Sequence, residues 1–300
     1  MKEIKSKDLD QFYTNPKVSD EVVNKTIDIF KRNNININEL KFIEPSAGTG
    51  NFIKSLEKYI NSKKIKAYDI DPKSNQIEKK DFLKLKIRKD KNNVIIGNPP
   101  FGKRSKIALE FVNKSFEVAD IICFILPRQF NRFLTQKKVD NNLKLIYSEN
   151  LNEDSFLVNN SSYNVNSVYQ IWVNKKNKFF ENEIDKRIIS EIKKHDDFDT
   201  FIHNNTKKTR VYFDKKQYKW TIALHRQGYY EYKDIIKEQN NLINNRQYFF
   251  VKSNIENRKF LRIVNNIDFD ELISNNTTVP GFSTSDFIRE YNKSKENLKI

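Results

Sequence analysis

Short apolar runs alternate with helix-patterned segments through the first half of the 300-residue chain, and this alternation limits the fold more than any other feature. Residues 51–60 and 107–118 carry apolar side chains at helical spacing. The expected strands cover residues 40–44, 65–69, 94–97, 121–126, 143–147 and 168–173. Strands that alternate with helices predict βαβ units and a mainly parallel sheet. The chain is therefore expected to contain an α/β domain whose ligands bind at the carboxyl ends of the strands.

A basic, polar stretch at residues 174–178 marks the expected end of this domain. We place the first domain at residues 1–177 and a smaller α+β domain at residues 178–300. In the second domain aromatic and basic residues interleave, as in 225–230, and Ser283 is expected to cap a helix that runs toward Tyr291.

The net charge predicts a polyanionic partner. Lys and Arg number 55 against 39 Asp and Glu, which gives a formal charge of +16. Excess positive charge attracts nucleic acid. The alternative is that the charge serves solubility and reflects an AT-rich genome, which raises the Lys, Asn and Ile content.

Cysteine, histidine and the N-terminus exclude several classes of protein. Cys123 is the only cysteine, so the chain forms no intramolecular disulfide, and its apolar neighbours predict a buried side chain. The three histidines lack the spacing of metal ligands, so no metal site is expected. The N-terminus lacks an apolar signal core, and no apolar run approaches the ~20 residues that span a bilayer. We therefore expect an intracellular, cytoplasmic protein.

A glycine-containing turn, Glu44–Phe52, follows the first strand and predicts a ligand site. Gly48 and Gly50 let the backbone approach a ligand closely. The third glycine of a dinucleotide fingerprint and the Gly-Lys-Ser/Thr of a phosphate loop are both absent. Glu44 at the start of the turn would repel pyrophosphate and suits a cationic or zwitterionic ligand. A purely structural turn remains the alternative.

Two carboxylates follow the next strand and extend this site. Asp69 ends the strand 65–69, where a carboxylate can accept hydrogen bonds from both hydroxyls of a ribose. Asp81 could accept from an adenine amino group, and Phe82 could pack on the ring. Solvated acids beside core aromatic residues are the alternative for both positions.

The most specific pattern is Asn98-Pro99-Pro100-Phe101, directly after the strand 94–97. Two consecutive prolines stiffen the corner and remove two backbone donors. The Asn98 side-chain oxygen and the Pro99 carbonyl can then each accept a hydrogen from one amino group. Phe101 offers a face on which a base can stack. The pattern predicts methylation chemistry at an arylamine or amide nitrogen, with a rigid structural loop as the alternative.

These motifs resemble those of Rossmann-like amino-methyltransferases that depend on S-adenosylmethionine. Residues 10–16, Asp-Gln-Phe-Tyr-Thr-Asn-Pro, are similar to the N-terminal motif of DNA adenine-N6 methyltransferases, and the motif order resembles their gamma group. The resemblance covers about the first 175 residues. It implies a mainly parallel sheet with an antiparallel last strand, S-adenosylmethionine as cofactor, and a C-terminal domain that recognises the DNA target.

The resemblance also implies roles for individual residues. Phe12, Tyr13 and Thr14 would close over the methionine part of the cofactor. Asn98, Pro99, Pro100 and Phe101 would hold the target base. The family places a second stacking aromatic before its last sheet strands, which Tyr163 or Phe156 would supply. The full set of expected cofactor residues is Phe12, Tyr13, Thr14, Glu44, Pro45, Ala47, Gly48, Gly50, Asn51, Phe52, Asp69, Ile70, Asp81, Phe82 and Asn98.

The expected partner is duplex DNA from which the adenine is flipped, because its amino group is otherwise buried in the stack. A separate cognate restriction endonuclease is a second partner that the resemblance allows. Asn-Pro-Pro-aromatic motifs also occur in methyltransferases of RNA bases and of protein glutamine side chains, so an RNA base methyltransferase is the main alternative. A non-catalytic DNA-binding subunit of a modification system is another.

Overall fold

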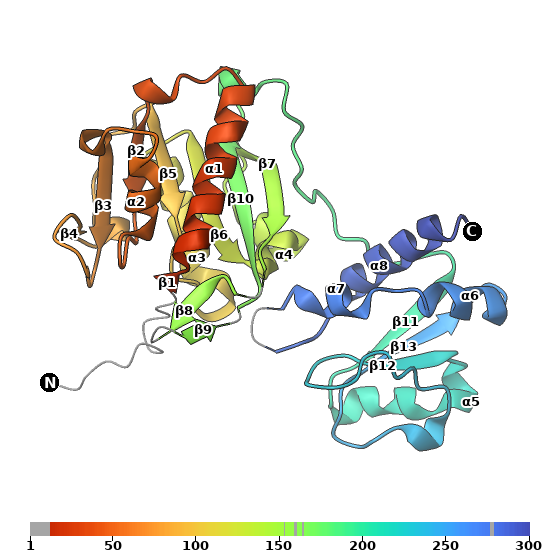
Figure 1. The fold of residues 1–300 in the computed structure, drawn as a ribbon. Helices are drawn as coiled ribbons and strands as arrows, with labels where there is room; N and C mark the ends of the chain where they lie inside the picture. Colours follow the sequence, from red (N-terminus) through yellow and green to blue (C-terminus); the bar gives the residue numbers. More distant parts are fainter. Residues whose placement is uncertain (1–12, 153, 159–160, 164, 277–278) are drawn as a thin grey trace, which may run out of the picture. The chain divides into compact units, whose positions relative to one another are not determined.

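The chain divides into two compact units, Met1–Ile189 and Ser190–Ile300, which are described separately. The computed structural model describes residues 13–152, 154–158, 161–163, 165–276 and 279–300. Figure 1 shows both units and labels their elements.

A seven-stranded sheet in the order β4-β3-β2-β5-β6-β10-β7 forms the centre of the first unit. Its strands are β2 (Lys41–Glu44), β3 (Ile65–Asp69), β4 (Glu78–Lys79), β5 (Asn93–Gly97), β6 (Ile121–Pro127), β7 (Leu143–Asn150) and β10 (Ser167–Asn174). Parallel pairing joins β4, β3, β2, β5 and β6. Only β10 is antiparallel, to β6 on one side and β7 on the other. The predicted α/β fold, mainly parallel with an antiparallel last strand, is confirmed.

Helices cover both faces of this sheet (Figure 1). On one face, α1 (Pro16–Arg32) and α2 (Asn51–Glu57) pack side chains such as Phe30 and Leu56 against the strands. On the other face lie α3 (Lys106–Phe116) and α4 (Phe133–Gln136). Short 3-10 helices occupy Ile37–Glu39 (η2), Ser62–Lys64 (η3), Phe82–Lys84 (η4), Lys103–Ser105 (η5), Arg128–Asn131 (η6) and Lys178–Phe180 (η7).

Helix α1 was not among the expected elements, although its start is marked in the sequence. The Asn15 side chain accepts from the Lys17 amide, and Pro16 occupies the first helical position. Both features favour a helix N-terminus.

A small antiparallel sheet places the N-terminal segment beside the glycine-containing turn. Its order is β1-β8-β9, from Tyr13–Thr14, Phe156–Val158 and Ser161–Tyr163. The Asn51 side chain at the start of α2 donates to the Thr14 carbonyl oxygen at 2.8 Å. Figure 1 shows these short strands beneath the main sheet. The segment around Tyr13 is thereby held at the carboxyl end of β2.

The first unit extends beyond residue 177, the expected domain boundary, to Ile189. Phe180 is fully buried and meets the Phe30 ring edge-on at 6.4 Å. Lys144 Nζ donates to the carbonyl oxygens of Phe180 and Glu183. The basic stretch at 174–178 runs from the last residue of β10 through a turn to the first residue of η7, and the chain then returns to the core.

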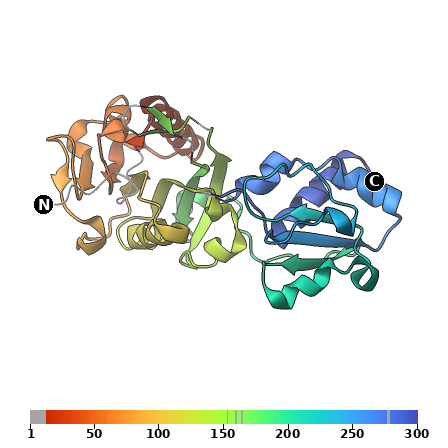
Figure 2. The same cartoon turned by 90° about the horizontal axis from the view of Figure 1, so that it is seen from below.

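The second unit is an α+β fold around the antiparallel sheet β11-β13-β12. Its strands are β11 (Phe198–His203), β12 (Ile222–His225) and β13 (Tyr248–Ser253). Helices α6 (Asn257–Val264), α7 (Phe269–Ser274) and α8 (Thr284–Asn297) cover one face. The other face carries an aromatic layer that includes η8 (Lys207–Phe213) and α5 (Lys215–Tyr218), while η9 spans Gln239–Asn241. Figures 1 and 2 show α5 and α6–α8 on opposite sides of the sheet.

Two sequence-based expectations are confirmed at single residues. Ser283 caps α8 in a reciprocal capping box with Asp286. Cys123 is fully buried in β6, and this burial raises the pKa of its thiol to about 12.

Across the described ranges, no cluster of three or more His, Cys, Asp or Glu could hold a metal ion. Nor does any helix within them combine the length and apolar character needed to cross a bilayer.

Alanine substitutions at two adjacent phenylalanines test whether residues 178–189 belong to the core of the first unit. We expect Phe180→Ala to lower its free energy of unfolding by about 3–5 kcal/mol, because a fully buried ring leaves a cavity. The matched control is Phe179→Ala, whose ring is 55% exposed and whose loss should change stability by about 0.5 kcal/mol or less. Urea unfolding of both variants makes the comparison. Equal, small effects would show that residues 178–189 are not part of the core.

Candidate active site

The carboxyl ends of β2, β3 and β5 form a cavity of about 330 Å³. A smaller cavity of about 30 Å³ adjoins it and shares the lining residues Tyr13, Ser46, Gly48 and Asn98. The larger cavity is lined by Tyr13, Pro45, Ser46, Gly48, Asp69, Ile70, Asp71, Asp81, Phe82, Leu83, Asn98, Pro99, Pro100, Phe101, Ile107 and Phe111. The smaller one is lined by Tyr13, Thr14, Glu44, Ser46, Ala47, Gly48, Thr49, Asn51, Phe52 and Asn98.

The glycine-containing turn contributes backbone to both cavities through Gly48. Its φ of +50° is left-handed, and an added Cβ would lie 3.0 Å from the Tyr13 ring. Gly48 therefore combines a backbone conformation and a close approach that other residues rarely tolerate. Gly50, also expected to bind the cofactor, lines neither cavity. Its left-handed backbone, with φ +78°, instead starts α2.

Asp69 organises the loops that follow β2 and β3. Its Oδ2 accepts from the Gly48 amide at 2.7 Å, and its Oδ1 accepts from the Asp71 amide at 2.8 Å. Each carboxylate oxygen has two acceptor sites, so both retain one for a ligand. The geometry leaves Asp69 able to accept hydroxyl hydrogens while it holds the turn.

Glu44 is a buried carboxyl group at the end of β2. Only 1% of it is exposed, and among the described residues its Oε2 has no hydrogen-bond partner. Burial, and then the nearby Asp69 charge, raise the pKa of Glu44 well above its usual value. Burial therefore disfavours the charged carboxylate, and a cation beside it would offset this cost.

Asp81 and Phe82 form part of the wall of the larger cavity, where Asp81 precedes η4 and Phe82 is its first residue. The Asp81 carboxylate caps η4 by accepting from the Leu83 amide at 3.1 Å, and it pairs with Lys84 at 2.8 Å. Phe82 is buried and stacked on Phe111 at 5.7 Å. Ile70, 54% exposed, adds an apolar surface. This wall offers two apolar side chains and a carboxylate to a flat heterocycle.

The Asn98–Phe101 corner closes the larger cavity after β5, and all four of its residues line that cavity. Ser46 Oγ donates to the Asn98 carbonyl oxygen at 3.0 Å, which ties the corner to the glycine-containing turn. After Phe101 the backbone is left-handed at Gly102, Arg104 and Ser105. Such conformations in non-glycine residues cost about 1–3 kcal/mol each and are common at functional sites.

Phe156, one of two candidates for the second stacking aromatic, supports Phe101 instead of facing the cavity. It is fully buried, lines neither cavity, and meets the Phe101 ring edge-on at 6.1 Å. The other candidate, Tyr163, ends β9 and pairs in register with Phe156. Of the three N-terminal residues expected at the cofactor, Tyr13 lines both cavities and Thr14 the smaller one, whereas Phe12 lies outside the described residues.

Sequence patterns missed several lining residues. Ile107 and Phe111 lie on α3, whose apolar spacing was predicted, but nothing in that spacing indicates which turn reaches the cavity. Ser46 joins the two loops through a bond to a residue 52 positions away, and no local signal marks such a contact. Asp71, Leu83 and Thr49 complete this group.

The two cavities are acidic in a basic protein. Their described lining residues include Glu44, Asp69, Asp71 and Asp81 but neither Lys nor Arg. The lining of the cavities therefore has the opposite charge balance to the chain as a whole, whose formal charge is +16. Asp71 and Asp81 form ion pairs with Lys73 and Lys84, so Asp69 contributes most of the negative charge that a ligand would meet. This charge favours a cationic group over a phosphate.

A comparison with known proteins found a family model that is similar to part of this unit. Residues 49–181 match the family model described as the EDM2 methyltransferase-like domain, and the matched segment includes the Asn98 corner. This segment is therefore methyltransferase-like in sequence. No curated protein matches the chain.

Several solved structures are similar to this chain at low sequence identity and low TM-score. Protein 1320 of Thermoplasma acidophilum has 19% identity over 52% of this chain and 86% of its own, with a TM-score of 0.39. The 23S rRNA methyltransferase ErmE has 14% identity over 55% of this chain and 70% of its own, with a TM-score of 0.39. The type IIL restriction-modification enzyme MmeI, solved in complex with DNA, has 12% identity over 78% and 47%, with a TM-score of 0.37. These similarities are too distant to indicate a substrate.

The protonation of Glu44 predicts a pH-dependent stability. Its raised pKa means that the folded protein keeps a proton which the unfolded chain releases above about pH 4.5. The folded state therefore loses stability as pH rises from that value, by up to ~1.4 kcal/mol per pH unit. Glu44→Gln removes this loss, so its stability relative to the parent should increase with pH.

Thermal unfolding of the ligand-free protein between pH 4 and pH 8 measures the effect, and Glu57→Gln, at an exposed position of α2, is the matched control. A stability difference between Glu44→Gln and the parent that stays constant across this range would contradict the assignment.

Proposed function

We propose that this chain is an S-adenosylmethionine-dependent methyltransferase that acts on the exocyclic amino group of adenine in DNA. The observation that supports this most is the acid-lined cavity with the Asn98–Phe101 corner in its wall. A cationic methyl donor and an amino-group acceptor would then occupy one continuous space, as methyl transfer requires.

The described residues fit S-adenosylmethionine. Glu44, whose buried Oε2 has no partner among the described residues, suits the ammonium or sulfonium charge. Asp69 would hold the ribose hydroxyls through its remaining acceptor sites. Phe82 and Ile70 would flank the adenine, and Asp81 would accept from its amino group. When bound, the cofactor supplies the methyl group, activated by the positive sulfur.

The corner after β5 would hold and polarise the target amino group. The Asn98 side-chain oxygen and the Pro99 carbonyl oxygen would each accept one of its hydrogens. These bonds draw the nitrogen lone pair out of conjugation with the ring and leave it available for the methyl group. The Phe101 ring, held in place by Phe156, would stack on the target base. Positioning and polarisation then supply the rate enhancement.

The net charge of +16 favours a nucleic acid of either kind, although four carboxyl groups line the two cavities. DNA is favoured over RNA by the resemblance of residues 10–16 to the N-terminal motif of DNA adenine-N6 methyltransferases and by the large second unit. The second unit, Ser190–Ile300, adds a fold large enough to recognise a target sequence. The adenine would leave the duplex stack to reach the corner, at a cost of a few kcal/mol.

Asn98→Ala tests the catalytic assignment. We expect the rate of methyl transfer to fall about 100-fold or more, as when one preorganised hydrogen-bonding group is lost from other active sites. Binding of S-adenosylmethionine, measured by calorimetry, should weaken much less. Asn141→Ala, at an exposed loop position before β7, is the matched control. If the Asn98→Ala variant transfers methyl groups at nearly the parent rate, Asn98 does not have the catalytic role proposed for it.

The substrate is tested by transfer of labelled methyl groups to duplex DNA, RNA and protein in parallel. Label on N6 of adenine in DNA is the expected result. Label on RNA alone would replace the proposal by the RNA base methyltransferase alternative. Binding of duplex DNA without binding of S-adenosylmethionine would indicate a non-catalytic subunit.

A further inference from the structure

Three polar segments meet at one end of the sheet in the second unit. Strands β11 and β12 end at His203 and His225, and both residues pair with Tyr248 at the start of β13. The chain segments at this end are residues 203–210, 225–230 and 244–248. We call them together the polar edge.

The polar edge is rich in basic and amide residues. It holds five basic residues and no Asp or Glu. Six of its other fourteen residues carry amide side chains. The basic and amide residues are Asn204, Asn205, Lys207, Lys208, Arg210, Arg226, Gln227, Asn244, Asn245, Arg246 and Gln247. Positive charge alone, as on lysine, is enough to contact phosphates. Arginine and amide side chains add hydrogen bonds of fixed direction, so a surface that combines them can do more than bind phosphates.

Hydrogen bonds fix the backbone of the loop after β12, while some of its side chains remain exposed to solvent. The Gly228 amide donates to the Pro280 carbonyl oxygen at 3.0 Å, and the Phe282 amide donates to that of Arg226 at 3.2 Å. The Tyr232 hydroxyl donates to the Gly228 carbonyl oxygen at 2.8 Å. Gln227 and Tyr229 remain exposed, Tyr229 to 78%.

The arginines at this edge are held by neighbouring side chains. The Arg246 guanidinium lies over the Tyr230 ring at 4.9 Å and donates to His225 Nε2 at 3.4 Å. His225 stacks on Tyr230 at 4.3 Å. Burial, and then the Arg246 charge, lower the pKa of His225, so its neutral ring can accept this bond.

Two further arginines bond to amide side chains. Arg226 donates to Asn204, and Arg210 donates to Asn244 at 2.6 Å. Side chains ordered in this way lose less conformational entropy when they bind.

We propose that the polar edge reads base edges in the major groove of duplex DNA and so determines which sequence is methylated. Arginine bonds in bidentate fashion to guanine, and asparagine and glutamine do so to adenine. Lys207 and Lys208 would contact phosphates, which position the protein without reading sequence. This inference rests on the proposed function and assigns the specificity of that function to residues of the second unit.

The experiment starts from a pool of duplexes with a randomised centre, from which the full-length protein selects its preferred sequence. Binding is then compared between the selected duplex and a scrambled one at fixed salt. Arg226→Ala, Arg226→Lys and Gln227→Ala should each reduce the ratio of the two affinities by roughly 10- to 100-fold. Affinity for the scrambled duplex should change about threefold or less, since one phosphate contact at most is lost.

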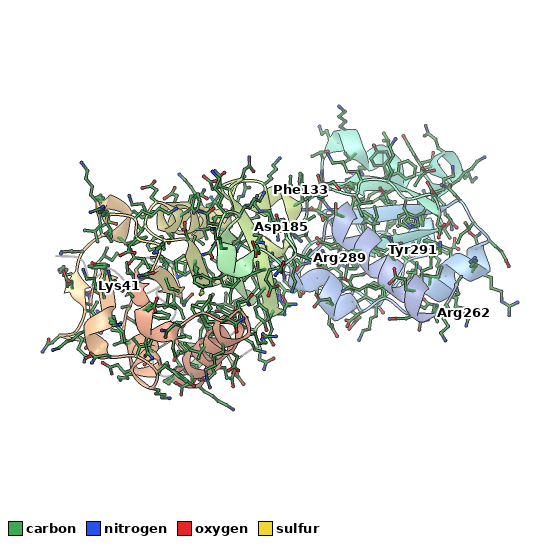
Figure 3. The ribbon with its side chains drawn as sticks, turned by 90° about the horizontal axis from the view of Figure 1, so that it is seen from above. Lys41, Phe133, Asp185, Arg262, Arg289 and Tyr291 are labelled. Carbon is green, nitrogen blue, oxygen red and sulfur yellow. The ribbon has the colours of Figure 1, made fainter. Side chains whose placement is uncertain are left out.

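Arg262→Ala on α6 is the matched control, because it removes the same charge outside the three segments (Figure 3). It should leave the ratio unchanged, and all variants should bind S-adenosylmethionine like the parent. Unchanged selectivity in Arg226→Ala and Gln227→Ala would overturn the inference, as would a parent protein that prefers no duplex sequence or prefers single-stranded RNA. If the parent transfers no methyl group but these variants lose selective duplex binding, the proposed methyltransferase function is wrong, while the role of the polar edge in reading duplex sequence is supported.

Discussion

Parallel pairing of β2 with both β3 and β5 determines where the polar groups of the candidate site lie. Because the three strands run in the same direction, Glu44, Asp69 and the Asn98 corner emerge at one edge of the sheet. Two side-chain bonds then fix the loops to each other, from the Gly48 amide to Asp69 and from Ser46 to the Asn98 carbonyl oxygen. Without this pairing, the carboxyl groups of the cavity and the Asn98–Phe101 corner would lie apart.

Local sequence patterns were sufficient for six of the seven strands of the main sheet, all but the two-residue β4, and were insufficient for long-range contacts. The strand expected at 65–69 is β3 without any shift, and that at 121–126 differs from β6 by one residue, because buried parallel strands are continuous apolar runs. The pairing of Tyr13 with Leu157, the return of Phe180 to the core and the support of Phe101 by Phe156 join residues far apart in sequence. Alternation and spacing carry no information about such contacts.

Electrostatics separates the parts of the molecule that face small and large ligands. The cavity at the strand ends gathers carboxyl groups, while the polar edge of the second unit contains only basic and neutral side chains. Uniform basic composition would produce neither feature. Under the proposed function, the net charge would attract the polyanionic substrate, and the local carboxyl groups would disfavour phosphates in the space of the cationic cofactor.

Under the proposed function, the buried Glu44 carboxyl would couple the binding of a cationic ligand to the release of a proton. A carboxyl group that is protonated in the ligand-free protein and ionised beside a bound cation gives up one proton in each binding event. Calorimetric heats of binding would then depend on the ionisation enthalpy of the buffer. Affinity for the cation would increase with pH, by up to about tenfold per unit, until the carboxyl group is ionised without it.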